Sequence, residues 1–162
     1  MTPVDQAHYR LDDPLGDCLA ACVASVLDLP LEAVPDVMAP LLDGTAPEGY
    51  RYTAAMNEWL ISTGLLLKHR FYGRVRSRFY GRPLTWHSGY WIAATRSKAV
   101  PGGGLHSVVM FGDEVVHDPQ PLARQEPYAS RPYRFAGELW FEAWDPALAA
   151  SGLRPGSPEE PA

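Results

Sequence analysis

Helix-forming and strand-forming segments occupy different parts of this sequence, and the division falls at Gly64. Before this glycine, the pattern predicts one helix over residues 18–29, ended by Pro30, and a second over residues 53–63. Thr53 is the predicted N-cap of the second helix, and Gly64 is its predicted end. The first helix is apolar on almost every side, which is typical of a helix at the centre of a domain.

The segments after Gly64 are short, rich in β-branched and aromatic residues, and separated by glycine and proline, as strands are. The predicted strands cover residues 65–72, 89–95, 105–111, 114–117 and 138–143. Helices followed by strands predict an α+β fold in which a mostly antiparallel sheet packs on the first helix. With 162 residues, the chain is expected to form a single domain over residues 1–150, and the Pro- and Glu-rich residues 151–162 are expected to form a disordered tail.

The composition indicates a globular protein outside the membrane. Hydrophobic residues make up 46% of the chain and charged residues 20%, and the apolar runs are far too short to cross a bilayer. The first residues lack the basic start and apolar stretch of a secretory signal. Cys18 and Cys22 lie four residues apart on a predicted helix, where a disulfide would be strained. We therefore expect reduced thiols and a cytoplasmic location.

Cys18 is predicted to open the first helix, which is a favourable place for a nucleophilic thiol. The first turn of a helix has unpaired backbone N–H groups and the positive end of the helix dipole, and both favour a thiolate. The same N–H groups could bind the oxyanion of a tetrahedral intermediate. Cys22, one turn deeper, is expected to be a structural core residue.

His106 and Asp118 stand at the two ends of a predicted β-hairpin. Pairing Phe111 with Asp113 about Gly112 would place His106 directly opposite Asp118, with the two side chains close enough to interact. An aspartate that accepts a hydrogen bond from one imidazole nitrogen fixes the tautomer that offers the other nitrogen to a thiol. A nucleophile, a base and an orienting group are therefore all present, and they predict reaction through a thioester acyl-enzyme.

Three motifs carry a resemblance to a known family: Gly-Asp-Cys-Leu-Ala-Ala-Cys-Val-Ala-Ser-Val-Leu, then Leu-His-Ser-Val-Val, then Val-His-Asp-Pro. Together they resemble the papain-like cysteine peptidase superfamily, and most closely its small bacterial and phage branch related to the domains that trim bacteriocin leaders at double-glycine sites. The resemblance implies that Cys18 is the nucleophile, His106 the general base and acid, and Asp118 the orienting residue. It also implies that Gln6 is an oxyanion donor, and that the reaction is hydrolysis of a peptide, isopeptide or related amide bond, without a cofactor.

Two other functions are compatible with these residues. An acyl or amide transferase would use the same thiol chemistry, with an amine in place of water. A non-catalytic binding module would instead use a basic segment, residues 68–82, which contains six cations and no acidic residue in a chain of net charge −5. Within this basic segment, Arg74, Arg76 and Arg78 could attract an acidic peptide or partner protein. Nucleic-acid binding is the weaker interpretation, because a solvated ribbon explains the same pattern.

Trp86, Tyr90 and Trp91 precede the histidine strand and could line a substrate cleft, although core packing explains them equally well. A structural zinc site normally has two close pairs of ligands, and here the cysteine pair has no matching histidine pair. We therefore expect no metal, and we expect the histidines other than His106 to be surface or packing residues. The sequence leaves the oligomeric state open.

Overall fold

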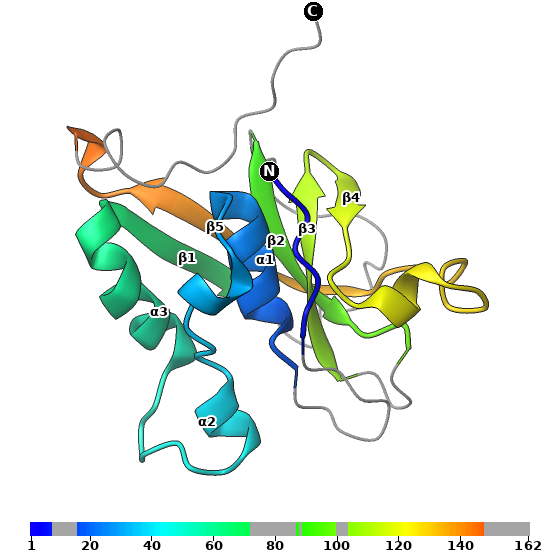
Figure 1. Cartoon of the computed structure of the whole chain (residues 1–162), viewed down its shortest axis with the longest axis horizontal. Coiled ribbons are helices and arrows are strands. Elements are labelled where there is room, and N and C mark those ends of the chain that lie inside the picture. The colour runs from blue at the N-terminus through cyan, green and yellow to red at the C-terminus, as the bar shows by residue number, and fades with distance from the viewer. Residues whose placement is uncertain (8–15, 72–86, 88, 100–103, 148–162) are drawn as a thin grey trace, which may run out of the picture.

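The computed structural model describes residues 1–7, 16–71, 87, 89–99 and 104–147 (Figure 1). Most of the helices precede the strands along the chain, and the fold is α+β, as predicted. The helical elements are α1 (Cys18–Leu27), η1 (Leu31–Ala33), α2 (Ala39–Leu42), α3 (Tyr52–Leu60), η2 (Ile61–Thr63) and η3 (Pro121–Arg124). The strands are β1 (Leu65–Phe71), β2 (Tyr90–Arg96), β3 (Leu105–Phe111), β4 (Glu114–His117) and β5 (Phe135–Ala143).

The strands form one five-stranded sheet in the order β1-β5-β2-β3-β4, and every neighbouring pair is antiparallel. The prediction of a mostly antiparallel sheet is confirmed. β5 is the last strand in the sequence, yet it lies inside the sheet between β1 and β2. β1 and β4 are the two edge strands.

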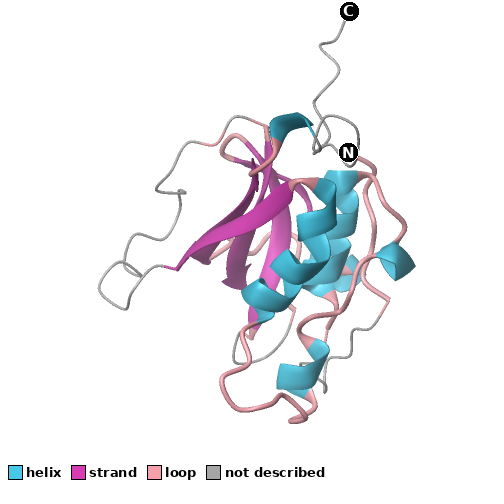
Figure 2. Ribbon diagram, turned by 90° about the vertical axis from the view of Figure 1, so that its left-hand side faces the viewer, coloured by secondary structure: helices cyan, strands magenta, loops and turns pink. Residues whose placement is uncertain are grey.

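The main hydrophobic core lies between the helices and one face of the sheet. Every residue of α1 after Cys18 is buried, because this helix is apolar on nearly all sides. α1 packs on β2 and β3, and α3 packs on β1. Figure 2 shows these helices on one side of the strands. The prediction that the sheet packs on the first helix is therefore confirmed. A second apolar cluster includes Trp91, Ala93, Val108 and Met110.

The helix ends differ in detail from the predicted ones. α1 ends at Leu27, two residues earlier than predicted, because Asp28 adopts a left-handed conformation (φ 56°) that closes the helix. Thr53 is not the N-cap of α3: that position belongs to Arg51, whose side chain makes no capping hydrogen bond. Gly64 ends the following 3₁₀ turn with φ 77°, as its lack of a β-carbon allows.

The turn between β3 and β4 contains two residues, Gly112 and Asp113, because Phe111 pairs with Glu114. The predicted pairing of Phe111 with Asp113 is therefore wrong. It left a single residue for the turn, whereas the tightest common hairpins need two. Gly112 has φ 58°, the positive value that the first residue of such a turn requires.

A bulge between Val109 and Met110 shifts the pairing once more, so that Val109 lies opposite His117. β4 ends at His117, and Asp118 is the first residue beyond it. His106 pairs with Thr95 of β2, on the other side of β3. The two residues of the predicted pair are thus not opposed within the sheet ladder.

Candidate active site

The structure nevertheless brings the His106 and Asp118 side chains together. His106 Nε2 lies 2.8 Å from Asp118 Oδ1 and donates a hydrogen bond to it. Only 5% of His106 and 3% of Asp118 is exposed to solvent. Because Nε2 is used for this bond, Nδ1 is the nitrogen that remains for a thiol.

The pKa of His106 responds to Cys18 as well as to Asp118. Burial, the largest influence, lowers the pKa of His106. Hydrogen bonds with Asp118 and Cys18, and the negative charges of both, outweigh it and raise the pKa to about 9. The imidazolium form is therefore favoured at neutral pH, between a carboxylate on one side and the sulfur on the other.

Cys18 is the first residue of α1 and is partly exposed. The preceding residue, Asp17, occupies the N-cap position, but its side chain makes no capping hydrogen bond. Its carboxylate instead accepts a hydrogen bond from the backbone N–H of Ala7, at 3.1 Å. Asp17 therefore does not cap the first-turn N–H groups of α1, which carry the positive end of the helix dipole beside Cys18.

Cys22 lies on the same helix and is completely buried. Burial, followed by the negative charges of Cys18 and Asp118, raises the pKa of the Cys22 thiol well above its ordinary value. This thiol therefore stays protonated and inert at neutral pH. Both cysteines are free.

Asp118 is held by three hydrogen bonds. Its Oδ1 accepts hydrogen bonds from His106 and from the backbone N–H of Gln120, the latter at 2.9 Å. Its Oδ2 accepts a hydrogen bond from the hydroxyl of Tyr133, also at 2.9 Å. Burial raises the pKa of Asp118, but the hydrogen bonds and the charge of His106 outweigh this and lower it. The carboxylate is therefore ionised and fixed in orientation.

Tyr133 and the neighbouring Lys98 are parts of the site that sequence reasoning missed. The ammonium of Lys98 lies 4.0 Å from the centre of the Tyr133 ring and donates to the carbonyl of Ala129 at 2.9 Å. Burial and the charge of Asp118 raise the pKa of Tyr133, so its hydroxyl remains a donor. No motif in the sequence marks either residue, because their roles arise only from tertiary contacts. The Asp118–Gln120 bond is a local turn of the kind that Asp-Pro sequences favour, and it could have been predicted.

Gln6 lies beside the segment that follows Asp118. It is 6% exposed, and its backbone N–H donates to the carbonyl of Pro119 at 3.0 Å. The next residue, Ala7, donates to Asp17. Pro119 follows the aspartate of the candidate triad, and Asp17 precedes its cysteine, so Gln6 lies between the segments that carry these two residues.

The N-terminal segment that carries Gln6, dark blue in Figure 1, is anchored on both sides. The backbone N–H of Val4 donates to Ser25 Oγ of α1 at 2.9 Å. The carbonyl of Val4 accepts from His117 Nε2, also at 2.9 Å. His117 is thus a buried packing residue that ties the segment to β4, and it is not a second base.

Tyr90 and Trp91 do not lie where a substrate cleft beside His106 would need them. They begin β2, whereas the partner of His106 is Thr95, near the other end of the same strand. Tyr90 and Thr95 are five positions apart along the strand, a distance of about 17 Å. Trp91 is 1% exposed, and its indole N–H donates to the carbonyl of Gly112. Core packing, the alternative that the sequence offered, accounts for both side chains: Trp91 is buried, and Tyr90 packs against the main core.

The remaining predicted site residues, Arg74, Arg76, Arg78 and Trp86, lie outside the described residues, as does the tail over residues 151–162. In the part of the chain that the structure describes, no three His, Cys, Asp or Glu side chains form a group that could hold a metal ion. Among the same residues, none of the helices combines the length and apolar character that a membrane span needs.

Comparison of the chain with protein-family models, curated proteins and solved structures finds no match. Fold and site alone therefore define the class of protein. It is an α+β domain with a five-stranded antiparallel sheet, in which a helix-opening cysteine meets a buried histidine–aspartate pair.

Proposed function

We propose that this protein is a papain-like thiol hydrolase that cleaves an amide bond through an acyl-enzyme on Cys18. The observation that carries the proposal is the buried His106–Asp118 pair, with the pKa of His106 raised by both Asp118 and Cys18. A base that is oriented on one side and contacts a thiol on the other is the arrangement that activates a nucleophile. The order of the elements, with the cysteine helix first and the histidine strand afterwards, supports the papain-like assignment.

In the first step, His106 holds the proton and the Cys18 thiolate attacks the carbonyl carbon of the substrate. A C–S bond forms, and the carbonyl oxygen becomes an oxyanion. The N–H groups in the first turn of α1 can donate to this oxygen, and the Gln6 side-chain amide is proposed as a further donor. The anchoring of the N-terminal segment through Val4 supports this role, because an oxyanion donor must be fixed before the reaction.

In the second step, His106 gives its proton to the leaving amine, and the C–N bond breaks to leave a thioester on Cys18. Water then attacks the thioester while His106 accepts one of its protons, and the free thiol and a carboxylic acid are produced. Asp118 keeps the imidazole in one orientation throughout, since both of its oxygens are held by hydrogen bonds. The substrate proposed is a peptide or isopeptide.

Acetylation by p-nitrophenyl acetate tests the proposal without knowledge of the natural substrate. Release of p-nitrophenol should show a burst, and mass spectrometry should find the acetyl group on Cys18. The burst should be absent in Cys18→Ala and at least about tenfold slower in His106→Gln, since a general base contributes about this much or more. Cys22→Ala is the matched control, because it removes the same group from a buried position of the same helix.

Equal rates of Cys18 acetylation in the wild type and in folded His106→Gln would contradict the proposal, since the thiol would then not be activated. The fate of the acetyl group separates hydrolysis from transfer. Loss of the acetyl group in water alone supports a hydrolase. Loss only when an amine is added would show that the enzyme is a transferase.

A further inference from the structure

The free edge of β1 is oriented to receive another strand. Among the described strands, β5 is the neighbour of β1, and no other strand pairs with it. The backbone N–H of Trp144 donates to the carbonyl of Gly64 at 2.9 Å, just before β1 begins. Hydrogen-bonded and non-hydrogen-bonded pairs alternate along an antiparallel ladder. The even-numbered residues of β1 therefore bond to β5, and the odd-numbered residues direct their N–H and C=O groups to the free edge.

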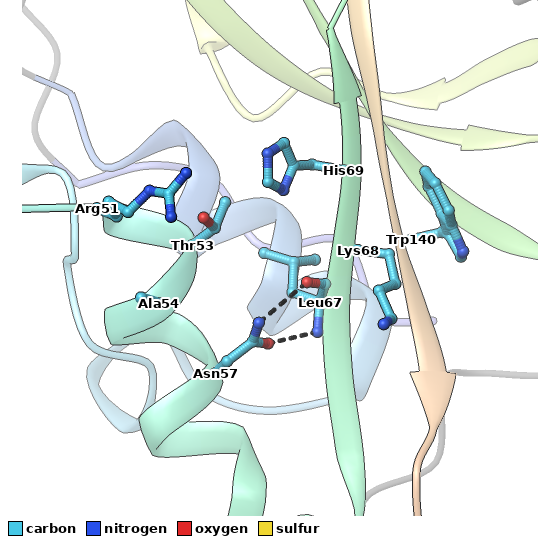
Figure 3. A pocket seen from close by; sticks show the side chains of 8 residues that line it. All are labelled: Arg51, Thr53, Ala54, Asn57, Leu67, Lys68, His69 and Trp140. Atoms are coloured by element: carbon cyan, nitrogen blue, oxygen red, sulfur yellow. Dashed lines mark hydrogen bonds between the residues drawn. The ribbon is translucent and has the colours of Figure 1, made fainter.

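The side chain of Asn57 of α3 already forms hydrogen bonds with this edge, at Leu67. The backbone N–H of Leu67 donates to Asn57 Oδ1 at 2.6 Å, and Asn57 Nδ2 donates to the carbonyl of Leu67 at 3.2 Å (Figure 3). The side-chain amide thus satisfies Leu67 in the way that a peptide group of a neighbouring strand would. This pair of bonds also confirms that the odd-numbered residues face outward.

His69 is the next outward-facing residue, and its edge is open. It lies two residues beyond Leu67 in a ladder whose register with β5 is regular. No helix, turn or loop in the described ranges forms a hydrogen bond with its backbone groups. The side chains of residues 68–71 are all exposed. The backbone N–H and C=O groups of His69 can therefore form hydrogen bonds with an added strand.

A cavity of about 380 Å³ adjoins this open edge, between α3 and β1. Figure 3 shows the Arg51 guanidinium, the Thr53 hydroxyl and the His69 ring directed into the same space. No acidic residue lines the cavity. Among the described residues, Arg51 has no ion-pair partner. The cavity also lies at the start of α3, where the helix has no side-chain cap and its dipole favours a negative charge.

We propose that the edge of β1 at His69 binds an extended peptide segment with acidic side chains, which adds as a strand and places a carboxylate in the cavity beside Arg51 and Thr53. Added strands gain affinity from backbone hydrogen bonds and specificity from alternate side chains that enter pockets. Both features are present here, in the outward-facing backbone groups of His69 and in the cavity beside Arg51. The proposal does not depend on the thiol chemistry.

Fluorescence anisotropy with a labelled peptide tests this proposal. The probe is fluorescein-Thr-Glu-Val-Glu-Thr-Glu-Val, titrated with the full chain carrying Cys18→Ala so that no cleavage can occur. We expect saturable binding that weakens as salt is added. Arg51→Gln should weaken binding at least about fivefold, as expected for loss of a charge-assisted hydrogen bond. Arg96→Gln is the matched control, because it removes the same charge from an exposed residue of β2 and should leave binding unchanged.

Two further probes test the mode of binding. A peptide with N-methyl groups on alternate amides should bind at least about tenfold more weakly, since it cannot pair with the strand edge. An oligothymidylate of similar charge should bind more weakly than the acidic peptide. The proposal is overturned if the peptide does not bind, if Arg51→Gln binds as the wild type does, or if the N-methylated peptide binds equally well. It is also overturned if the oligonucleotide binds more tightly and depends on Arg51, because the surface would then recognise nucleic acid.

Discussion

The buried pair of His106 and Asp118 should make the free energy of unfolding fall as the pH rises above neutrality. The pKa of His106 is about 9 in the folded protein, against an ordinary value of 6.5. Each unit of difference corresponds to about 1.4 kcal/mol, so protonated His106 contributes about 3 kcal/mol to stability. Because the folded-state pKa is the higher one, this contribution is complete below about pH 6.5 and is lost as the pH rises through about 9.

Urea unfolding at about pH 6 and about pH 9.5 measures this contribution. Between these values the wild type should lose about 3 kcal/mol more than His106→Gln, which has no imidazole to titrate and serves as the reference. Asp118→Asn removes the charge that holds the proton on His106, so it should lose less than the wild type over the same interval. Asp118 itself contributes no change in stability over this interval, because its pKa is lowered from the ordinary value and it stays ionised throughout.

Equal losses in the wild type and in His106→Gln would refute this reasoning. His106 would then titrate in the same way in the folded and unfolded chains, and the hydrogen bond to Asp118 would carry no charge. The proposed activation of the thiol would lose its electrostatic basis at the same time.

Three other substitutions test individual contacts. Tyr133→Phe removes the donor to Asp118 Oδ2 and should slow thiol acetylation about threefold to tenfold, which corresponds to the roughly 0.7–1.4 kcal/mol of a typical hydrogen bond. An unchanged rate and pH profile would show that this bond is dispensable. Asn57→Ala should lower the free energy of unfolding by about 1–3 kcal/mol, because both backbone groups of Leu67 lose their partner. If urea unfolding shows that Asn57→Ala lowers the free energy of unfolding by less than about 0.5 kcal/mol, this expectation is contradicted. Cys22→Ala should lower the free energy of unfolding by about 1 kcal/mol through lost packing and leave the acetylation rate unchanged. Loss of acetylation in a folded Cys22→Ala variant would instead indicate that the two thiols act as a pair.

The features that the sequence predicted well depend on local patterns. The change from helix to strand at Gly64 follows from periodicity and a single glycine, and the bounds of β3 and β4 were predicted to the residue. α1 was predicted because an apolar helix that begins after Gly-Asp and ends near proline has few alternatives. These signals act over a few residues, so one sequence is enough to recognise them.

The features that were missed depend on contacts between distant segments. The register of the β3–β4 hairpin was wrong because Gly112 was counted as the whole turn and the bulge at Val109 has no sequence marker. The approach of Asp118 to His106 therefore does not follow from the strand pairing used to predict it. Tyr133, which holds Asp118 from a segment 15 residues away, could not have been found from any spacing.

The position of β5 has a consequence for how the domain is made. A ribosome releases the chain from its N-terminus, so β1 to β4 emerge before the strand that belongs between β1 and β2. Until residues 135–143 are free, the sheet consists of two separate parts, and the strand edges that will meet β5 are both unpaired. In a nascent chain that ends before Phe135, Cys18, His106 and Asp118 already belong to the β2-β3-β4 part, because α1 packs on β2 and β3, whereas β1 and α3 have no sheet strand to join them to it. The attachment of β1 and α3 to the rest of the domain should therefore come late in synthesis, when β5 closes the sheet.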